Sequence, residues 1–562
     1  MGRVLLKKII IRNLGPIKED GVILDPLTYF VGRNNAGKSH YLKAIETLLA
    51  TKTPTKTDMA ILQNDKSQPV YIEGHFSGVG DFTSLVSVSN HKKAIEDSMT
   101  DGVLKVVRVL DPNNEDSTVF GVLKSDGTVH NATGFPTNLL KILPDPISIV
   151  ATADTLDELK SKENTALSKL KKEVLITFLS TLKEKTQTAL SGLNDFLHSA
   201  DEGLRSPELT QLERNLRTEF EGEFSDVIPS IEFQLPDEEV ITKEMKIFLD
   251  DGHKSEIEQK GHGLQRAMLL ALFRLLAKHG QRYQSRPTPI FLIGEFETFL
   301  HPFAQKQLAA VLNTLVDKYQ IVTTTHSPFI ISPEVINGYR KVRKIPEVGT
   351  KAANPPESGI DFTLVKRNLE RRGNLEGLFA DRIILIEGDH DENFFNKLLS
   401  VFQIILPPKQ FTLFVKAGGK EELRQTRKFY TQMNFDDVVI IADLDCLFSR
   451  DAKNLMKEIG MDENIPQSLR THIEWTEQGD PSLKYVIEKI AEKGESAGFE
   501  KLITDLEAKR VFVFRKGSPE MYYANNIGKK DGWAEINTEA DLLEPAYLKE
   551  MMDKALSCQN HT

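Results

Sequence analysis

The stretch that decides the fold of this chain is Val31-Gly32-Arg33-Asn34-Asn35-Ala36-Gly37-Lys38-Ser39. An apolar run precedes it at residues 27–31, and apolar residues at helical spacing follow it over residues 41–49. A Gly-x-x-x-x-Gly-Lys-Ser sequence between a strand and a helix is typical of a phosphate-binding loop, because backbone N–H groups and a helix N-terminus then face an anion. We expect the loop to bind ATP, with Lys38 at the β- and γ-phosphates and Ser39 at Mg²⁺. The cofactor-binding residues expected in this loop are Gly32, Asn35, Gly37, Lys38 and Ser39.

The composition is that of an ordinary protein with several domains. A chain of 562 residues is long enough for roughly two to four domains of about 150 residues each. Its net charge of −10 excludes a uniformly basic surface, so any nucleic-acid site must be a local basic groove. The two cysteines, Cys446 and Cys558, exclude a disulfide framework and a cysteine metal site and favour a reducing compartment. With no long apolar run and no signal peptide, we expect a cytoplasmic protein with no membrane partner.

The first 345 residues are expected to form one nucleotide-binding domain with an insertion. Strands are predicted at residues 4–13, 21–31, 69–77, 103–110, 118–123 and 147–150, which places the N-terminal lobe at residues 1–151. Residues 152–223 are rich in Lys, Glu and Leu and predict a helical insertion that serves dimerisation, although a solvated helical layer of the same domain is an alternative. The C-terminal lobe is expected at residues 224–345.

Three further motifs lie in the C-terminal lobe. Gly261-His262-Gly263-Leu264-Gln265-Arg266 opens an apolar helix, which indicates a second anion-binding helix N-terminus or else a tight turn. A buried strand at residues 290–293 ends at Gly294-Glu295, and nucleotides bind outside the carboxyl ends of such strands. Another strand ends at Thr325-His326-Ser327-Pro328, which places His326 near a γ-phosphate unless its role is structural.

A second centre is predicted in a new α/β domain at residues 376–535, after a connector at residues 346–375 and before a helical tail at residues 536–562. One apolar strand ends at Glu387-Gly388, and a later one ends at Asp443-Leu444-Asp445. Carboxylates gathered at one sheet edge repel one another, so divalent cations must neutralise them, and oxygen ligands without cysteine select Mg²⁺ or Mn²⁺ over Zn²⁺. Turn-forming acids at strand ends would explain either motif alone.

In this order, the four ATPase motifs resemble those of the ABC-type ATPases of the recombination and chromosome-maintenance group. The resemblance implies two heads that sandwich ATP, with Gly261 and Gly263 contacting the nucleotide of the other head. It further implies that Glu295 is the catalytic carboxylate and that His326 is the switch histidine. Relatives usually carry an acid where this chain has Gly294, so hydrolysis is expected to be slow or absent.

The later half resembles the TOPRIM domain, and the whole resembles the OLD (overcoming lysogenization defect) family of ATP-binding nucleases, which includes the nuclease subunit of the Gabija antiphage system. The resemblance implies that Glu387 and Asp391 bind one metal ion and Asp443 and Asp445 the other. In Lys516-Gly517-Ser518-Pro519-Glu520, it implies that Lys516 stabilises charge in the transition state and Glu520 completes the metal shell. Glu295, Lys516, Glu387 and Asp443 are the expected catalytic residues.

The expected function is therefore that of an ATP-binding, Mg²⁺- or Mn²⁺-dependent DNA endonuclease or nickase, acting in antiphage defence as a homodimer or a dimer of dimers. An ATP-sensing scaffold that controls a partner effector is the alternative. The sequence leaves open whether ATP is hydrolysed and whether a helicase, or a reverse transcriptase with its RNA, takes part. A groove for DNA is expected from basic residues near the second centre, namely Lys416, Lys420, Arg424, Arg427, Lys428, Arg515, Lys529 and Lys530.

Overall fold

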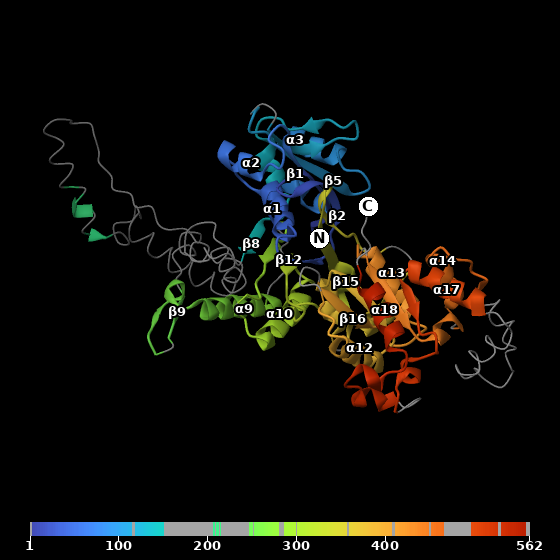
Figure 1. Cartoon of the computed structure of the whole chain (residues 1–562). Coiled ribbons are helices and arrows are strands. Elements are labelled where there is room, and N and C mark those ends of the chain that lie inside the picture. Colours follow the sequence, from blue (N-terminus) through green and yellow to red (C-terminus); the bar gives the residue numbers. More distant parts are fainter. Residues whose placement is uncertain are drawn as a thin grey trace. The chain divides into compact units, whose positions relative to one another are not determined.

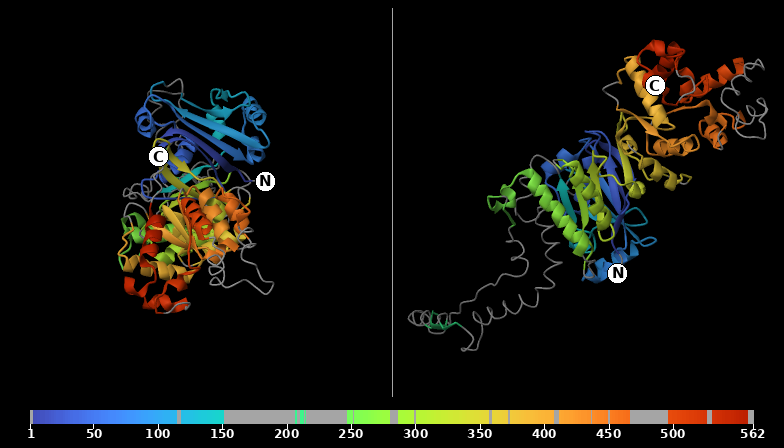
Figure 2. Two further views of the ribbon diagram at one scale, coloured as in Figure 1. Left: turned by 45° about the vertical axis from the view of Figure 1, so that its right-hand side comes forward. Right: turned by 90° about the horizontal axis from the view of Figure 1, so that it is seen from below.

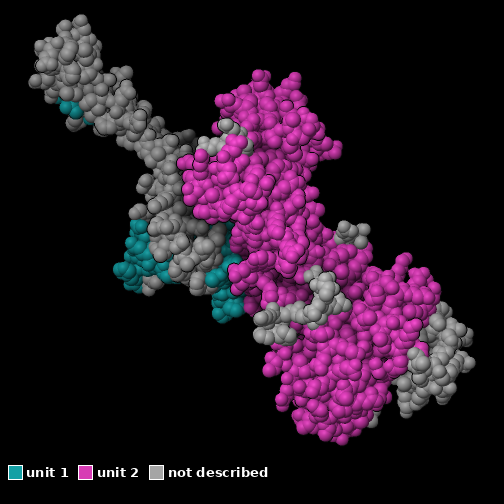
Figure 3. Space-filling model, turned by 45° about the horizontal axis from the view of Figure 1, so that its top comes forward, with its two compact units in different colours: residues 1, 144–321 teal, residues 2–143, 322–562 magenta. Residues whose placement is uncertain are grey.

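The chain forms two compact units, coloured separately in Figure 3: residues 1 and 144–321 in one, residues 2–143 and 322–562 in the other. The computed structural model describes residues 3–557 except 115–117, 151–205, 208–209, 213, 215–246, 251, 280–285, 299, 357–358, 372, 407–410, 436, 449–450, 466–495 and 526–529. The predicted helical insertion at residues 152–223 lies outside the described residues, apart from a few positions between 206 and 214.

An antiparallel sheet of six strands opens the second unit, in the order β2-β1-β4-β5-β6-β7, and its strands are blue to teal in Figures 1 and 2. Inward-facing residues of β1, such as Leu6, Ile9 and Ile11, are fully buried, as expected for a sheet with one face on a core. The strands are β1 (Leu5–Leu14), β2 (Ile17–Ile23), β4 (Val70–Ser77), β5 (Val103–Leu110), β6 (Val119–Leu123) and β7 (Val129–His130). Helices α2 (Lys56–Leu62) and α3 (Ser89–Asp97) lie between these strands in the sequence, and α4 (Phe135–Leu140) follows β7.

The strand predicted at residues 21–31 is two strands, so that expectation was wrong. β2 ends at Ile23 and β3 covers Leu27–Val31 in a different sheet. The chain turns at Asp25-Pro26, where proline has no N–H for a ladder and the backbone N–H of Asp25 donates to Oγ1 of Thr28 at 2.9 Å. Every residue of β3 is buried, which is typical of a strand inside a parallel sheet.

β3 delivers the chain to the phosphate-binding loop and to helix α1 (Lys38–Leu49). It pairs in parallel with β13 (Tyr339–Ile345), which in turn pairs with β14 (Gly349–Ala352) in the predicted connector. On the other side of β3 lies β12 (Gln320–Thr325), the strand at which the chain passes from the first unit into the second. The residues that follow β3 and β12 meet, since Nζ of Lys38 lies 2.6 Å from Nε2 of His326.

The first unit contains the parallel pair β8 (Pro146–Val150) and β11 (Ile290–Gly294), in register from Ile290 opposite Pro146. The unit also contains helices α9 (His262–His279) and α10 (Pro302–Leu315) and the short strands β9 (Phe248–Leu249) and β10 (Ser255–Glu256). Among the described residues, no helix has both the length and the apolar character needed to cross a bilayer.

The C-terminal part of the second unit is a four-stranded parallel sheet in the order β16-β15-β17-β18. Ile384 and Ile386 of β15 share a buried cluster with Val439 and Ile441 of β17 and with helices α12 and α18. The alternate residues face the opposite side, where α13 packs against β15 and β17. The elements are β15 (Arg382–Ile386), β16 (Thr412–Lys416), β17 (Val438–Ala442), β18 (Val511–Val513), α11 (Phe362–Leu369), α12 (Asp389–Val401), α13 (Leu423–Gln432), α14 (Ala452–Glu458), α17 (Ser496–Ala508) and α18 (Pro545–Leu556).

Helix α18 belongs to this core. Leu548, Met552 and Ala555 are fully buried in the same cluster as Ile384, so the predicted boundary at residue 536 divides one hydrophobic core. The guanidinium of Arg510 donates to the carbonyls of Lys554, Ala555 and Ser557 at 2.8 to 3.0 Å. A cation at a helix C-terminus satisfies carbonyls that have no partner inside the helix.

Candidate metal centre and nucleotide-binding loop

The phosphate-binding loop needs glycine at two positions because the chain passes close to its neighbours there. A Cβ atom on Gly32, whose φ is 151°, would lie 2.4 Å from the carbonyl oxygen of Val342. A Cβ atom on Gly37, whose φ is 99°, would lie 2.8 Å from Oγ1 of Thr350. Asn35 also has a left-handed backbone, with a φ of 61°, which asparagine tolerates better than most residues. The loop conformation is thus set by its contacts with β13 and β14.

Two of the predicted ATP-binding residues meet in this loop. The Nζ atom of Lys38 lies 2.6 Å from Nε2 of His326 and donates to the carbonyls of Gly32 and Arg33 at 3.2 and 3.0 Å. Lys38 is 4% exposed, whereas Ser39 is exposed in the first turn of α1. The lysine ammonium therefore satisfies carbonyl groups of its own loop.

The other predicted nucleotide residues belong to the first unit. Glu295 follows β11 with a left-handed backbone, φ 46°, and its carbonyl accepts hydrogen bonds from the backbone N–H and the Oγ1 of Thr298 at 3.1 and 2.9 Å. The carbonyl of Gly261 accepts the backbone N–H groups of Leu264 and Gln265 at the start of α9, and Gly263 lies in the first turn of this helix. A Cβ atom on Gly261 would meet no described atom within 4 Å, so packing within the described chain does not require glycine there.

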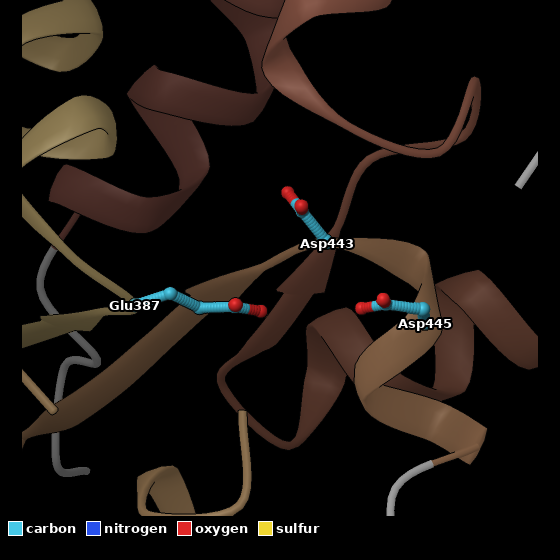
Figure 4. A group of neighbouring side chains, drawn as sticks. All are labelled: Glu387, Asp443 and Asp445. Atoms are coloured by element: carbon cyan, nitrogen blue, oxygen red, sulfur yellow. The ribbon is translucent and has the colours of Figure 1, made fainter. Parts of the chain in front are cut away.

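At the sheet of the C-terminal part, three carboxylates come together. β15 and β17 are parallel neighbours, in register from Ile383 opposite Val438, so the residues after each strand share one edge. One carboxylate oxygen from each of Glu387, Asp443 and Asp445 lies within 4.8 Å of the others. Figure 4 shows the carboxylates of Glu387 and Asp445 pointing toward each other.

This carboxylate cluster is electrostatically strained. Burial, with the nearby negative charges of Asp445 and Asp391, raises the pKa of Glu387 to about 7. Burial, with the charges of Glu387 and Asp391, raises the pKa of Asp443 to about 9. Oε1 of Glu387 and Oδ1 of Asp445 are buried and accept no hydrogen bond from a described residue. Oxygen atoms of this kind in a negatively charged pocket fit a divalent metal ion, whose positive charge removes the repulsion.

The side chain of Asp391, which is expected to share a metal with Glu387, forms hydrogen bonds with backbone N–H groups. Its Oδ2 accepts hydrogen bonds from the N–H groups of Glu387 and Gly388, both at 3.0 Å, in the first turn of α12. Its charge still acts on Glu387 and Asp443. Among the described residues, the group that meets the metal-ligand criterion contains Glu387, Asp443 and Asp445 and not Asp391, so the division into two pairs remains a prediction.

Lys516 and Glu520 flank the cluster on the loop after β18. The backbone N–H of Leu444, between the two aspartates, donates to the carbonyl of Gly517 at 2.7 Å, which ties the Lys516 loop to the cluster. The Nζ atom of Lys516 pairs with Oε1 of Glu544 at 2.9 Å. Glu520 lies 3.7 Å from Nε2 of His390. Glu544 was missed from the sequence because it precedes α18, far along the chain from the metal motifs.

Four of the eight basic residues expected to line a DNA groove form ion pairs with acidic side chains of the chain. Lys420 pairs with Asp445 at 2.9 Å, Lys416 pairs with Asp389 and Glu392, and Arg515 pairs with Glu500. Arg424 pairs with Asp451 and Glu458. Lys428 instead donates to the carbonyl of Gly359 at 3.1 Å, and Lys529 lies outside the described residues. These cations are therefore partly neutralised, and a phosphate must compete with carboxylates for them.

Contacts also join the nucleotide loop to the strand that carries Glu387. Arg33 of the loop pairs with Asp381, the residue before β15, at 3.3 Å. Lys341 of β13, opposite Val31 in register, donates to the carbonyls of Leu378 and Ala380 at 2.9 and 2.6 Å. Burial lowers the pKa of Lys341 to about 7. The segment before β15 is thus held by the residues beside the phosphate-binding loop.

Metal binding should depend on pH because of the raised pKa values of Glu387 and Asp443. The folded, metal-free protein keeps protons on these groups that the unfolded chain loses at about pH 4, so its stability should fall as the pH rises toward 9. Mg²⁺ displaces these protons, and the increase in melting temperature that it causes should be larger at pH 9 than at pH 6. The measurement is thermal unfolding with EDTA or Mg²⁺ at both pH values.

The Asp443→Asn variant is the control for this measurement, since it should respond weakly to Mg²⁺ at either pH. An equal Mg²⁺ response of the wild-type protein at pH 6 and pH 9 would contradict the assignment.

Comparison with known proteins covers both halves of the chain. A family described as "AAA ATPase domain" matches residues 5–115 and 123–331, and one described as "Overcoming lysogenization defect protein-like, TOPRIM domain" matches residues 378–445. The "Old nuclease" of Escherichia phage P2 is 28% identical over 409 residues, which are 69% of each chain. The "OLD nuclease" of Thermus scotoductus is 24% identical over 74% of this chain and 78% of its own. The "Endonuclease GajA" of Bacillus cereus is 22% identical over 70% of this chain and 67% of its own.

Solved structures of SMC heads also match. The Smc head bound to the C-winged helix domain of ScpA is 13% identical over 62% of this chain and 96% of its own, with a TM-score of 0.34. The SMC head domain from Thermotoga maritima is 12% identical over 63% of this chain and 99% of its own, with a TM-score of 0.31. The sequence matches confirm the expected order of an ATPase domain and a TOPRIM domain. The chain belongs to the AAA ATPase domain family and, with its OLD-like TOPRIM domain, is a homologue of the OLD nucleases.

Proposed function

We propose that this protein is an ATP-binding, divalent-metal-dependent DNA endonuclease or nickase of the OLD type. The observation that carries the proposal is the partly buried group of Glu387, Asp443 and Asp445 at one edge of the parallel sheet, with the Lys516 loop bonded to it through Leu444. The names of the relatives support the reaction class. A pure scaffold has no chemical need for three partly buried, mutually repelling carboxylates.

Glu387, Asp443 and Asp445 would hold the metal ion, with Asp391 and Glu520 near enough to add charge or complete a second site. Bound Mg²⁺ or Mn²⁺ supplies Lewis-acid activation of water and neutralises charge on a leaving oxygen. The ammonium group of Lys516 supplies hydrogen bonds to phosphate oxygens as negative charge grows in the transition state.

Replacing Asp443 by Asn should lower cleavage of supercoiled plasmid in Mg²⁺ or Mn²⁺ by about 10³-fold or more, since a metal ligand is lost. Lys516→Ala should also lower cleavage by about 10²- to 10³-fold but leave metal affinity unchanged, since its role is with the phosphate. Asp389→Asn is a matched control because Asp389 is 86% exposed and pairs with Lys416 outside the group. If both test variants cut DNA at the wild-type rate, the nuclease proposal fails and the scaffold alternative replaces it.

The nucleotide site is proposed to bind ATP through Lys38 and its loop, with Ser39 at Mg²⁺, Glu295 as the hydrolytic carboxylate and His326 at the γ-phosphate. The distance of 2.6 Å between Lys38 and His326 supports this pairing of roles. Gly294 ends β11, at the position where the resemblance to ABC-type ATPases implies an acid, so hydrolysis should be slow.

Calorimetry with ATP should show binding by the wild-type protein and none by Lys38→Ala, because the charge that meets the phosphates is gone. Lys43→Ala, a half-exposed lysine on the same helix, should bind as the wild type does. Phosphate release should be slow in the wild-type protein. Unchanged ATP affinity of Lys38→Ala would refute the site.

ATP is proposed to regulate the nuclease through the contacts beside β15. Lys38 must leave the carbonyls of Gly32 and Arg33 to reach a phosphate, and Arg33 pairs with Asp381 directly before β15. Plasmid cleavage with and without ATP is the comparison that tests this regulation, and equal rates would refute it.

The active assembly is proposed to be a homodimer or a dimer of dimers. Gly261 and Gly263 would contact the nucleotide of a second copy, and residues 152–223 would form an interface. Light scattering at micromolar concentration, with and without ATP, should give at least twice the 63.3 kDa mass of one chain. A monomer under both conditions would contradict this assembly.

The proposed setting is antiphage defence in the cytoplasm, which rests on the resemblance to the Gabija nuclease subunit, and phage infection of cells with and without the gene tests it. Domain limits are proposed at residues 1–151, 152–223, 224–345, 346–375 and 376–535, with residues 536–562 sharing the core of the last. Limited proteolysis should cut at these limits and leave α18 attached.

A further inference from the structure

Lys516 has a carboxylate partner that none of the metal motifs contains. Its Nζ atom lies 2.9 Å from Oε1 of Glu544, and the two side chains are 37% and 48% exposed. The pair is therefore open to solvent and to a ligand. In the Lys-Gly-x-x-Glu motif, Lys516 is the residue that we assign to the phosphate. Its ion-pair partner therefore affects how Lys516 can bind a phosphate.

The backbone holds Glu544 in this position. The N–H of Leu543 donates to the carbonyl of Tyr522 at 2.8 Å, and a β-bridge joins Leu542 to Tyr523. Pro545 then opens α18, whose buried residues lie in the core of the sheet. Glu544 itself has a left-handed backbone, with φ 55° and ψ 50°. Residues other than glycine seldom adopt this conformation, so the surrounding structure imposes it.

Lys516 is anchored on its own side. Its backbone N–H donates to the hydroxyl of Tyr522 at 3.0 Å, the same residue whose carbonyl accepts from Leu543. The ring of Tyr522 stacks on that of Tyr547 of α18, with centroids 5.8 Å apart. Lysine and glutamate thus face each other across a rigid frame that Tyr522 shares.

We propose that Glu544 is a counter-ion that occupies Lys516 until a phosphodiester displaces it, and so sets the affinity of the site for the DNA backbone. The inference rests on the proposed function and deepens it. A lysine ammonium cannot interact at full strength with a carboxylate and a phosphate at once. Binding of DNA to Lys516 therefore requires that the Lys516–Glu544 ion pair break or weaken. Glu544 acts through the charge of Lys516 and touches no reacting atom.

The size of the effect follows from the exposure of the pair. A half-exposed pair of this kind changes an equilibrium by about two- to fivefold. Glu544→Gln keeps the size of the side chain and removes its charge. It should therefore tighten binding of a fluorescent DNA duplex by about two- to fivefold, measured by anisotropy in EDTA so that neither metal nor cleavage enters. With Mg²⁺, KM for cleavage should fall by the same factor and kcat should stay constant.

Glu550→Gln is the matched control. Glu550 lies on α18 and pairs with a lysine, Lys554, at 2.9 Å with partial exposure. The charge of Arg515 also acts on it, but its ion pair is with Lys554 and not with Lys516. This variant should bind and cleave as the wild type does. Equal duplex affinity of wild type, Glu544→Gln and Glu550→Gln would overturn the proposal, and so would a lower kcat for Glu544→Gln, since Glu544 would then orient Lys516 for catalysis.

A double-mutant cycle shows whether Glu544 acts through Lys516. In a Lys516→Ala background, Glu544→Gln should have no effect on duplex affinity. A gain that persists without Lys516 would mean that Glu544 repels DNA directly, and the counter-ion role would be wrong. The proposed function has a separate test: it is wrong if the wild-type protein does not cut plasmid with any divalent metal. The anisotropy measurement needs no cleavage, so the two failures can be distinguished.

Discussion

The mutual repulsion of three carboxylates is the constraint on which the C-terminal part of this protein depends. Parallel pairing of β15 and β17 obliges Glu387 and Asp443 to leave the sheet at one edge, and Asp445 follows two residues later. Burial prevents water from screening them, so the pKa values of Glu387 and Asp443 rise to about 7 and about 9. A metal-free protein must hold protons in this cluster, and a divalent ion can take their place.

The rest of this region holds the repelling groups in position. One carboxylate oxygen of Asp391 accepts hydrogen bonds from two backbone N–H groups at the start of α12. These bonds fix the turn after Glu387. The bond between Leu444 and Gly517 fixes the Lys516 loop against the turn that carries the aspartates. Lys420 forms an ion pair with Asp445, and Lys516 forms one with Glu544. The cations near the centre are therefore available to a phosphate only by exchange of partners.

In the nucleotide loop, too, a cation already has partners within the chain that a phosphate would have to replace. Lys38 is buried and donates to carbonyls of its own loop, so a phosphate must replace these partners. Arg33 and Lys341 then connect the loop to the segment before β15. Lys341 is a buried lysine whose partners are carbonyl oxygens, and burial lowers its pKa to about 7, so its charge is sensitive to any change in these contacts.

Sequence alone determined the order of the motifs, the two-domain character, most strand positions and the acids at the strand ends. Such features are local, since apolar periodicity and turn residues act over a few positions along the chain. The strand prediction for residues 21–31 was wrong at Asp25-Pro26, where one apolar stretch is divided between strands of two different sheets. Only the tertiary structure decided that α18 shares the TOPRIM core, that Asp391 caps a helix and that Glu544 meets Lys516. These depend on contacts between distant parts of the chain, and no local pattern encodes which carboxylate a lysine will reach after the core has packed.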